Sequence, residues 1–433
     1  MGEYSQDANA LVLLVGLLLL FFKFIITGEI KYPVSNFTNH TFLIFLGWIL
    51  IGFVVNIPDI IPSYFKQTSG INRFLRQLFS LTLSSVLFFT FYYNVISYLG
   101  KQKVLTYIRK IFLASLIIVS AYSFLEILIL RVGLTQLIPI IKLFDYLPFV
   151  DVYLDTRLGR LSSITYEPPA LAMYLITVAG WMFSYILTSK GFKKFVPAIL
   201  VLLLAILSGS RTSLVVVLFQ FVVFLFHIFS LEKYYKLVLR IFVGTFSVIV
   251  LVSVFNYTAI KEFVDEKSDS LDFTNVKDNF SNQSRLGIQY TSLLIFKENP
   301  VFGVGYGQQA FHAEHKYPYW AVKNNWEFEK KYLNERVKSF PPGYNVYTRL
   351  LAETGIVGLL LFVFFVSSFF YQAKQLKKDS QNKTMGIVII VSMSGFVLNW
   401  LQIDSFRMYG VWLCLAALCF LYNNQKKENT NVV

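Results

Sequence analysis

The feature of this sequence that most constrains its fold is a series of apolar runs of about 20 residues. Each run is long enough to cross the hydrocarbon core of a bilayer as a helix. The chain is 55% hydrophobic and only 15% charged, which is too apolar for an ordinary soluble domain. The runs are continuous rather than alternating, which excludes a transmembrane β-barrel. We therefore predict an all-α polytopic integral membrane protein.

Eleven transmembrane helices are predicted, and ten or twelve are also compatible with the pattern. The predicted spans are residues 8–27, 40–57, 74–99, 111–130, 168–188, 195–207, 212–229, 237–256, 344–371, 385–401 and 406–422. The chain then divides into residues 1–256 with eight spans and a smaller outer loop at 131–167, a large loop at 257–343, and residues 344–433 with the last three spans and a short tail.

The distribution of charge gives the orientation. The net charge is +14, and the basic residues concentrate in short connections between spans, as the positive-inside rule predicts for cytoplasmic loops. A nucleic-acid partner is therefore not needed to explain the charge. The segment 257–343 carries eleven basic and eleven acidic side chains and is neutral. We expect this segment to be extracytoplasmic and the C-terminal tail to be cytoplasmic.

The long loop contains candidate binding residues, and a loop of this length is usually a working element. Gly305, in GVGYG, marks a tight re-entrant turn after Pro300, where backbone approaches a ligand or another helix closely. His312 and His315 lack the HExxH spacing of zinc ligands, so we predict no metal site. They are candidates to hydrogen-bond sugar hydroxyls beside the rings of FHAEHKYPYW, and simple loop packing is the alternative.

Arg211 is the basic residue that topology explains least. It stands in SGSR, at the tight turn between the sixth and seventh spans. A cation at the positive end of a helix dipole is unfavourable unless an anion binds there. Free N–H groups, Ser210 and the guanidinium would converge on such an anion. The alternative is an interfacial arginine that reaches a lipid phosphate.

Other charged residues fall in the predicted extracytoplasmic segments. Arg157, Arg160 and Arg285 favour bidentate phosphate recognition, and solvated loop charges are the alternative. Glu167 precedes a proline pair at the start of the fifth span. Its carboxylate either complements the helix N-terminus or binds a sugar hydroxyl and accepts its proton.

A polar face begins the ninth span. Asn345, Arg349 and Glu353 recur every four residues and share one side of a helix. Arg349 and Glu353 can pair with each other. Polar groups on an apolar span are expected to face the bundle or a cavity rather than lipid.

Four motifs follow one another in order: YEPPALAMYL, SGSR, SR followed by ENPVFGVGYG, and YNVYTRLLAETGIVG. Together they resemble the O-antigen polymerase and O-antigen ligase superfamily of bacterial surface-polysaccharide assembly, over roughly residues 160–365. The first spans match it only in hydropathy.

The resemblance implies an inverting, metal-independent glycosyltransferase without a cofactor, in the bacterial cytoplasmic membrane. It implies undecaprenyl-pyrophosphate-linked oligosaccharides as donor and acceptor, surrounding membrane lipids, and a chain-length regulator and a flippase as further partners. In that family, pyrophosphate is bound by one arginine at the SGSR position and one in the outer loop. These positions correspond to Arg211 and Arg285 in this chain. The family often has His-Asn where this chain has Tyr344-Asn345. Tyr344 can hydrogen-bond a hydroxyl but is a poor base near neutral pH. Either Glu167 or a histidine of the loop then takes the role of base, or no strong base is needed.

We predict a polysaccharide polymerase in which Arg211 and Arg285 bind the donor pyrophosphate. Glu167, Asn345 and the aromatic loop would orient the acceptor. A ligase that transfers the finished glycan to another acceptor is one alternative. A flippase is another, and it is disfavoured because the polar residues cluster at one surface and no inverted repeat is visible.

Overall fold

The computed structural model describes residues 8–146, 152–156, 159–165, 167–229 and 280–431. Within these ranges the chain is mostly helical, and six helices are long and apolar enough to cross a membrane. These are Phe37–Val55, Gly70–Leu99, Val104–Leu130, Pro168–Thr188, Arg211–Phe229 and Val346–Lys378. The prediction of a multi-pass α-helical membrane protein is confirmed at this level. The predicted eighth span, residues 237–256, lies outside the described residues.

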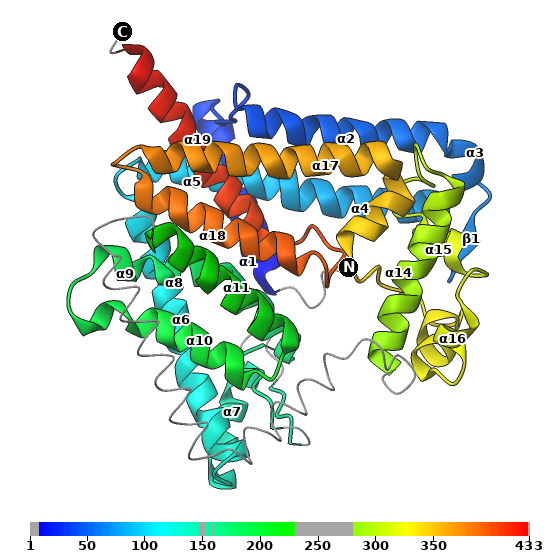
Figure 1. The fold of residues 1–433 in the computed structure, drawn as a ribbon, viewed down its shortest axis with the longest axis horizontal. Helices are drawn as coiled ribbons and strands as arrows, with labels where there is room; N and C mark the ends of the chain where they lie inside the picture. Colours follow the sequence, from blue (N-terminus) through cyan, green and yellow to red (C-terminus); the bar gives the residue numbers. More distant parts are fainter. Residues whose placement is uncertain (1–7, 147–151, 157–158, 166, 230–279, 432–433) are drawn as a thin grey trace.

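The described elements are arranged along the chain as Figure 1 shows. They are α1 (Ala8–Thr27), α2 (Phe37–Val55), α3 (Ile57–Ile60), β1 (Tyr64–Phe65), β2 (Thr68–Ser69), α4 (Gly70–Thr82), η1 (Leu83–Leu87), α5 (Phe88–Leu99), α6 (Val104–Leu130), η2 (Thr135–Leu137), α7 (Ile138–Lys142), η3 (Leu143–Tyr146), α8 (Pro168–Phe183), α9 (Tyr185–Thr188), η4 (Phe192–Lys194), α10 (Val196–Leu207), α11 (Arg211–Phe229), α14 (Phe280–Glu298), α15 (Gln309–Ala313), α16 (Tyr319–Val322), η5 (Phe328–Tyr332), α17 (Val346–Lys378), α18 (Lys383–Asn399) and α19 (Tyr409–Asn431).

The helices pack around α17 and α18. α17 lies along α2, α19 packs on α5, and α18 contacts both α17 and the pair formed by α8 and α11. α14 packs against α17, near the N-terminal end of that helix (Figure 1). The largest apolar cluster runs through this bundle and includes the fully buried rings of Trp181, Trp400 and Trp412.

The end of the second span differs from expectation. The span was predicted to run to residue 57, but α2 ends at Val55, and Pro58 lies in the first turn of the short helix α3. Proline is tolerated there because the first N–H groups of a helix have no intrahelical partner. The short turn leads the chain into the β1–β2 hairpin, in which Tyr64 pairs with Ser69 and Phe65 with Thr68.

Helix α17 is broken at Gly355. This residue has φ +67° and ψ −171°, which is far from helical geometry. The segment after Pro300 turns back onto the break, and a Cβ built on Gly355 would overlap the carbonyl oxygen of Val301. Only glycine combines a positive φ with this close backbone approach. The re-entrant turn expected in GVGYG is therefore present, and it approaches another helix.

The turn, together with Trp48 of α2, also supplies partners for the backbone groups that the break leaves open. Three carbonyls before the break and one N–H after it are each hydrogen-bonded. The pairs are Val304 N to Ala352 O (2.9 Å), Gly305 N to Glu353 O (2.9 Å), Trp48 Nε1 to Thr354 O (2.9 Å) and Ile356 N to Pro300 O (2.8 Å). Buried backbone groups without partners are costly, so this turn is what allows α17 to break inside the protein.

Gly355→Ala is expected to lower the free energy of unfolding by about 2–4 kcal/mol, because it adds left-handed backbone strain to a steric overlap. The midpoint of thermal unfolding in detergent measures this. Gly47→Ala on α2 is the control, since nothing lies within 4 Å of a Cβ there. An unchanged midpoint for Gly355→Ala would contradict the account of the break.

Candidate functional site

The turn between α10 and α11 places Arg211 at the first residue of α11. Gly209 has φ +61° and reverses the chain. The Ser208 hydroxyl accepts a hydrogen bond from Ser210 N (3.2 Å), and the Ser210 hydroxyl accepts one from Ser213 N (3.4 Å). Ser210, a predicted substrate-binding residue, therefore caps α11 and fixes the start of that helix at Arg211.

Arg160 lies against this turn. A Cβ on Gly209 would come within 2.6 Å of Arg160 Cγ, and Leu161 N donates to Leu207 O at 3.4 Å. The Arg160 Nε donates to Asp155 Oδ2 at 2.8 Å, and the Asp155 side chain is buried. Arg160 is thus near Arg211, with its charge paired inside its own segment.

A buried carboxylate on α6 holds the same segment in place. Glu126 is fully buried, and its two oxygens accept hydrogen bonds from Ser162 N and Ser163 N, both at 2.9 Å. Ser163 has φ +54°. These two hydrogen bonds to consecutive N–H groups tie the loop that carries the left-handed Ser163 to α6. Sequence reasoning missed Glu126, although an acid inside an apolar run is itself a signal.

Glu167 follows this loop at the N-cap position of α8, with extended backbone and no side-chain capping bond. Its backbone carbonyl accepts from the Thr165 hydroxyl at 3.0 Å. Within the described ranges its carboxylate makes no hydrogen bond or ion pair, so it is available to a ligand. Arg157, another predicted binding residue, lies outside the described residues.

Arg285 is brought to Arg211 by α14. The two guanidinium groups lie close enough for their positive charges to act on each other. Arg285 Nη1 donates to Gln402 Oε1 at 3.0 Å, and its guanidinium lies 5.1 Å from the centre of the Tyr344 ring. The buried Nε of Arg285 has no hydrogen-bond partner among the described residues. Two cations from distant parts of the chain therefore converge on one place, an arrangement suited to an anion.

Tyr344 forms the next part of this site. Its hydroxyl and the Tyr332 hydroxyl are 2.5 Å apart, and its backbone has φ +55°. Removal from water raises the pKa of Tyr344 above its ordinary value, and the charge of Glu327 adds to this, whereas the Tyr332 bond and Arg285 act against it. The phenol therefore keeps its proton near neutral pH and serves as a hydrogen-bonding group rather than a base.

Asn345 caps α17. Its Oδ1 accepts from Tyr347 N (2.9 Å) and Thr348 N (3.3 Å), and its Nδ2 lies 3.4 Å from Gln289 Oε1. This side chain, predicted to bind substrate, ties the start of α17 to α14.

Arg349 and Glu353 face inward from α17, as a polar helix face was expected to do. Arg349 Nε donates to Glu353 Oε2 at 3.0 Å, Nη2 to Gln77 Oε1 at 3.0 Å, and Nη1 to the carbonyl oxygen of Asp404 at 2.8 Å. All three nitrogens of the guanidinium are engaged, so these predicted binding residues brace α17 against α4 and the α18–α19 connection. A cavity of about 20 Å³ beside them is lined in part by Arg73, Arg349, Glu353 and Asp404, and holds about one water molecule.

The connection between α18 and α19 contributes residues that sequence reasoning missed. It supplies Gln402, which holds Arg285, and Asp404, whose Oδ2 accepts from Gly343 N at 2.7 Å. The indole N–H groups of Trp400 and Trp412 donate to Ser405 O (3.2 Å) and Phe406 O (2.9 Å) and fix the connection. A short polar stretch between two apolar runs gives no periodic pattern from which this role could be read.

The predicted loop residues lie farther along the same end of the bundle. Gly305 donates its N–H to the broken part of α17. His312 is on α15, where removal from water lowers its pKa, and His315 is exposed. Among the expected stacking rings, Tyr319 and Trp320 are exposed, whereas Tyr317 packs edge-on against Phe328 with ring centres 4.8 Å apart. Among the described residues, no group of three or more His, Cys, Asp or Glu side chains is placed to hold a metal ion.

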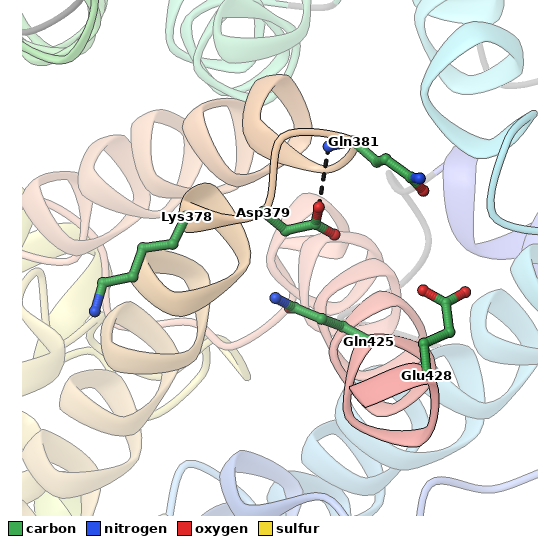
Figure 2. Close-up of a pocket in the computed structure, with 5 residues that line it drawn as sticks. All are labelled: Lys378, Asp379, Gln381, Gln425 and Glu428. Carbon is green, nitrogen blue, oxygen red and sulfur yellow. Dashed lines mark hydrogen bonds between the residues drawn. The ribbon is translucent and has the colours of Figure 1, made fainter. Parts of the chain in front are cut away.

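A larger cavity, of about 300 Å³, lies at the other end of α17. It is lined by Lys378, Asp379, Gln381, Gln425 and Glu428 (Figure 2). Asp379 Oδ1 accepts from Gln381 N at 3.0 Å. The part of α17 after the break, residues 356–378, alone spans about 35 Å, so this cavity is far from the arginine pair.

A family model described as O-antigen ligase matches residues 196–363. This range includes Arg211, Arg285, Tyr344, Asn345, Arg349 and Glu353, and it leaves out Glu126, Arg160, Glu167, Gln402 and Asp404. No curated protein matches the chain.

Asn345→Ala is expected to destabilise the protein by about 1 kcal/mol, because two N–H groups at the start of α17 lose their acceptor. Asn345→Asp retains that acceptor and is expected to retain stability. Thermal unfolding in detergent and enzymatic activity are measured together for both variants. A large loss of activity in Asn345→Asp with unchanged stability would show that the amide has a role besides capping.

Proposed function

Because residues 196–363 match a family model described as O-antigen ligase, we propose that the chain is a polysaccharide polymerase of the O-antigen ligase and polymerase superfamily. It transfers a growing undecaprenyl-pyrophosphate-linked glycan onto a lipid-linked repeat unit at the outer face of the bacterial cytoplasmic membrane. The observation that carries this proposal is the convergence of Arg211 and Arg285, two like charges that an anionic group would bridge.

The donor pyrophosphate is bound by these two arginines. Arg211 is the first residue of α11, where backbone N–H groups and the helix dipole favour a negative charge. Arg285 is oriented by Gln402 and by the ring of Tyr344, and its buried Nε remains as a donor. Phosphate oxygens are strong acceptors for guanidinium donors, and the pairs are often bidentate.

The reaction is a displacement at the anomeric carbon of the donor's reducing-end sugar. A hydroxyl oxygen of the acceptor sugar forms the new bond from the opposite face, while the bond to pyrophosphate oxygen breaks and the configuration inverts. The leaving undecaprenyl pyrophosphate carries the electron pair, and the arginines stabilise the charge that develops on it. Holding the acceptor hydroxyl in line supplies further acceleration.

The side chain that we propose as recipient of the acceptor proton is Glu167. The Glu167 carboxylate has no partner within the described ranges, whereas Tyr344 keeps its own proton because its pKa is raised. With pyrophosphate as a good leaving group, the proton can also pass to water late in the reaction.

A ligase is the second candidate, and the description of the matching family favours it. Such an enzyme would use the same donor site and transfer the finished glycan to a different acceptor. The two functions differ in the acceptor, which the arginine pair does not touch.

Arg211→Ala and Arg285→Ala are each expected to reduce glycan transfer by about 100-fold or more, as expected for losing a preorganised donor to developing negative charge. Arg336→Ala is the matched control, because Arg336 is exposed in the same predicted loop. Transfer is measured with purified protein and lipid-linked repeat units, after confirming that each variant is folded. Full activity in both arginine variants would refute the proposed site.

Deleting the gene separates the two functions through the size profile of surface and lipid-linked glycan. For a polymerase we expect single repeat units on the final acceptor and loss of the ladder. Long chains stranded on undecaprenyl pyrophosphate would instead identify a ligase. Single units trapped at the cytoplasmic face would contradict both and identify a transporter.

A further inference from the structure

Lys66 is buried in a strained hairpin turn outside the region that matches the family. It joins β1 to β2, and its side chain is only 1% exposed. Lys66 and Gln67 have φ +49° and +59°, so both central residues of this two-residue turn are left-handed. Such turns normally use asparagine and glycine, because other residues are strained there. An interaction elsewhere must therefore stabilise this conformation.

That interaction is a cluster of three backbone carbonyls around the Lys66 ammonium. Its Nζ donates to Lys331 O at 2.6 Å, Asn334 O at 3.0 Å and Val337 O at 3.0 Å. An ammonium group has three donors, and all three are used. A cation on the hairpin thus fixes one conformation of residues 331–337, which contain no regular element beyond the end of η5.

Aromatic packing places the hairpin against the same region. Phe65 is buried, and the centre of its ring lies 5.9 Å from that of Phe340 and 6.5 Å from that of Phe311. The Arg73 guanidinium lies over the Phe340 ring, 4.2 Å from its centre. The apolar packing holds the hairpin near the segment, and the Lys66 bonds determine the path of its backbone.

The fixed segment leads to the arginine site through one side chain. Tyr332 is buried, lies next to Lys331 in the chain, and has its hydroxyl 2.5 Å from that of Tyr344. The Tyr344 ring in turn lies against the Arg285 guanidinium at 5.1 Å. A continuous series of contacts therefore runs from Lys66 to Arg285.

We propose that Lys66 is a positioning residue for glycan transfer: by holding residues 331–337 it sets Tyr332, which orients Tyr344 beneath Arg285. This inference rests on the proposed function. It assigns a role in the site's geometry to the hairpin between α3 and α4, far in sequence from the matched region. The effect is expected on the catalytic step, because a misplaced donor weakens binding of the charge that develops during transfer.

Lys66→Met tests this, since methionine has a similar length and no charge. We expect kcat for transfer to fall about tenfold or more with a small change in KM. Hydrogen exchange should accelerate in residues 331–337 and stay unchanged in α18. Lys338→Met is the matched control, because Lys338 is exposed beside the same segment and should leave both readouts unchanged.

A double-mutant cycle with Tyr332→Phe decides whether Lys66 acts through the tyrosine pair. Tyr332→Phe removes only the hydroxyl, and the double variant should be no slower than the slower single variant, because both changes interrupt one series of contacts. Losses of kcat that multiply would overturn the proposal. If Lys66→Met does not fold, Lys66→Gln takes its place with the same expectations, and an unchanged kcat in Tyr332→Phe alone would also overturn it.

Failure of this inference is distinguishable from failure of the proposed function. Normal kcat in Lys66→Met together with loss of transfer in Arg285→Ala would leave the proposed function standing and remove only the role of Lys66. Normal transfer in Arg285→Ala would remove both.

Discussion

The proximity of the Arg211 and Arg285 guanidinium groups, whose positive charges act on each other, is the feature on which the proposed anion site depends. Like charges repel, so bringing the two groups together has a cost. Separate interactions hold the two arginines in place. Arg211 stands at the start of a serine-capped helix, and Arg285 is hydrogen-bonded to Gln402. An anion with two phosphates would convert the repulsion into attraction, and the binding geometry is already formed before it arrives.

The two arginines are held in place by polar interactions at one end of an otherwise apolar helix bundle. α17 breaks at Gly355, and the turn after Pro300 satisfies its open backbone groups. Arg349 then joins α17 to α4 and to the connection that carries Gln402. Buried polar groups need hydrogen-bond partners, so each of these contacts limits the conformations that the neighbouring residues can adopt. Rigidity at this end is therefore a property of the bundle's hydrogen bonds rather than of any single loop.

Sequence reasoning identified a multi-pass helical membrane protein from its long apolar runs, and it singled out the two arginines as candidates because they are cations that topology does not explain. It could not show that Arg211 and Arg285 meet, since their proximity depends on how α11 and α14 pack. Ser210 and Asn345 were read as ligands for substrate, but their oxygens cap helices, and capping and binding use the same side chains. Lys66 and Gln402 left no signal, because their partners are distant backbone carbonyls and a distant arginine.

The most direct measurement is an experimental structure of the protein in lipid nanodiscs with undecaprenyl pyrophosphate. The account predicts two phosphate groups between Arg211 and Arg285, with guanidinium nitrogens about 2.7–2.9 Å from phosphate oxygens. It also predicts that the Arg285 bond to Gln402 and the Tyr332–Tyr344 pair persist in the complex. Pyrophosphate bound elsewhere, with neither arginine in contact with it, would contradict the central claim.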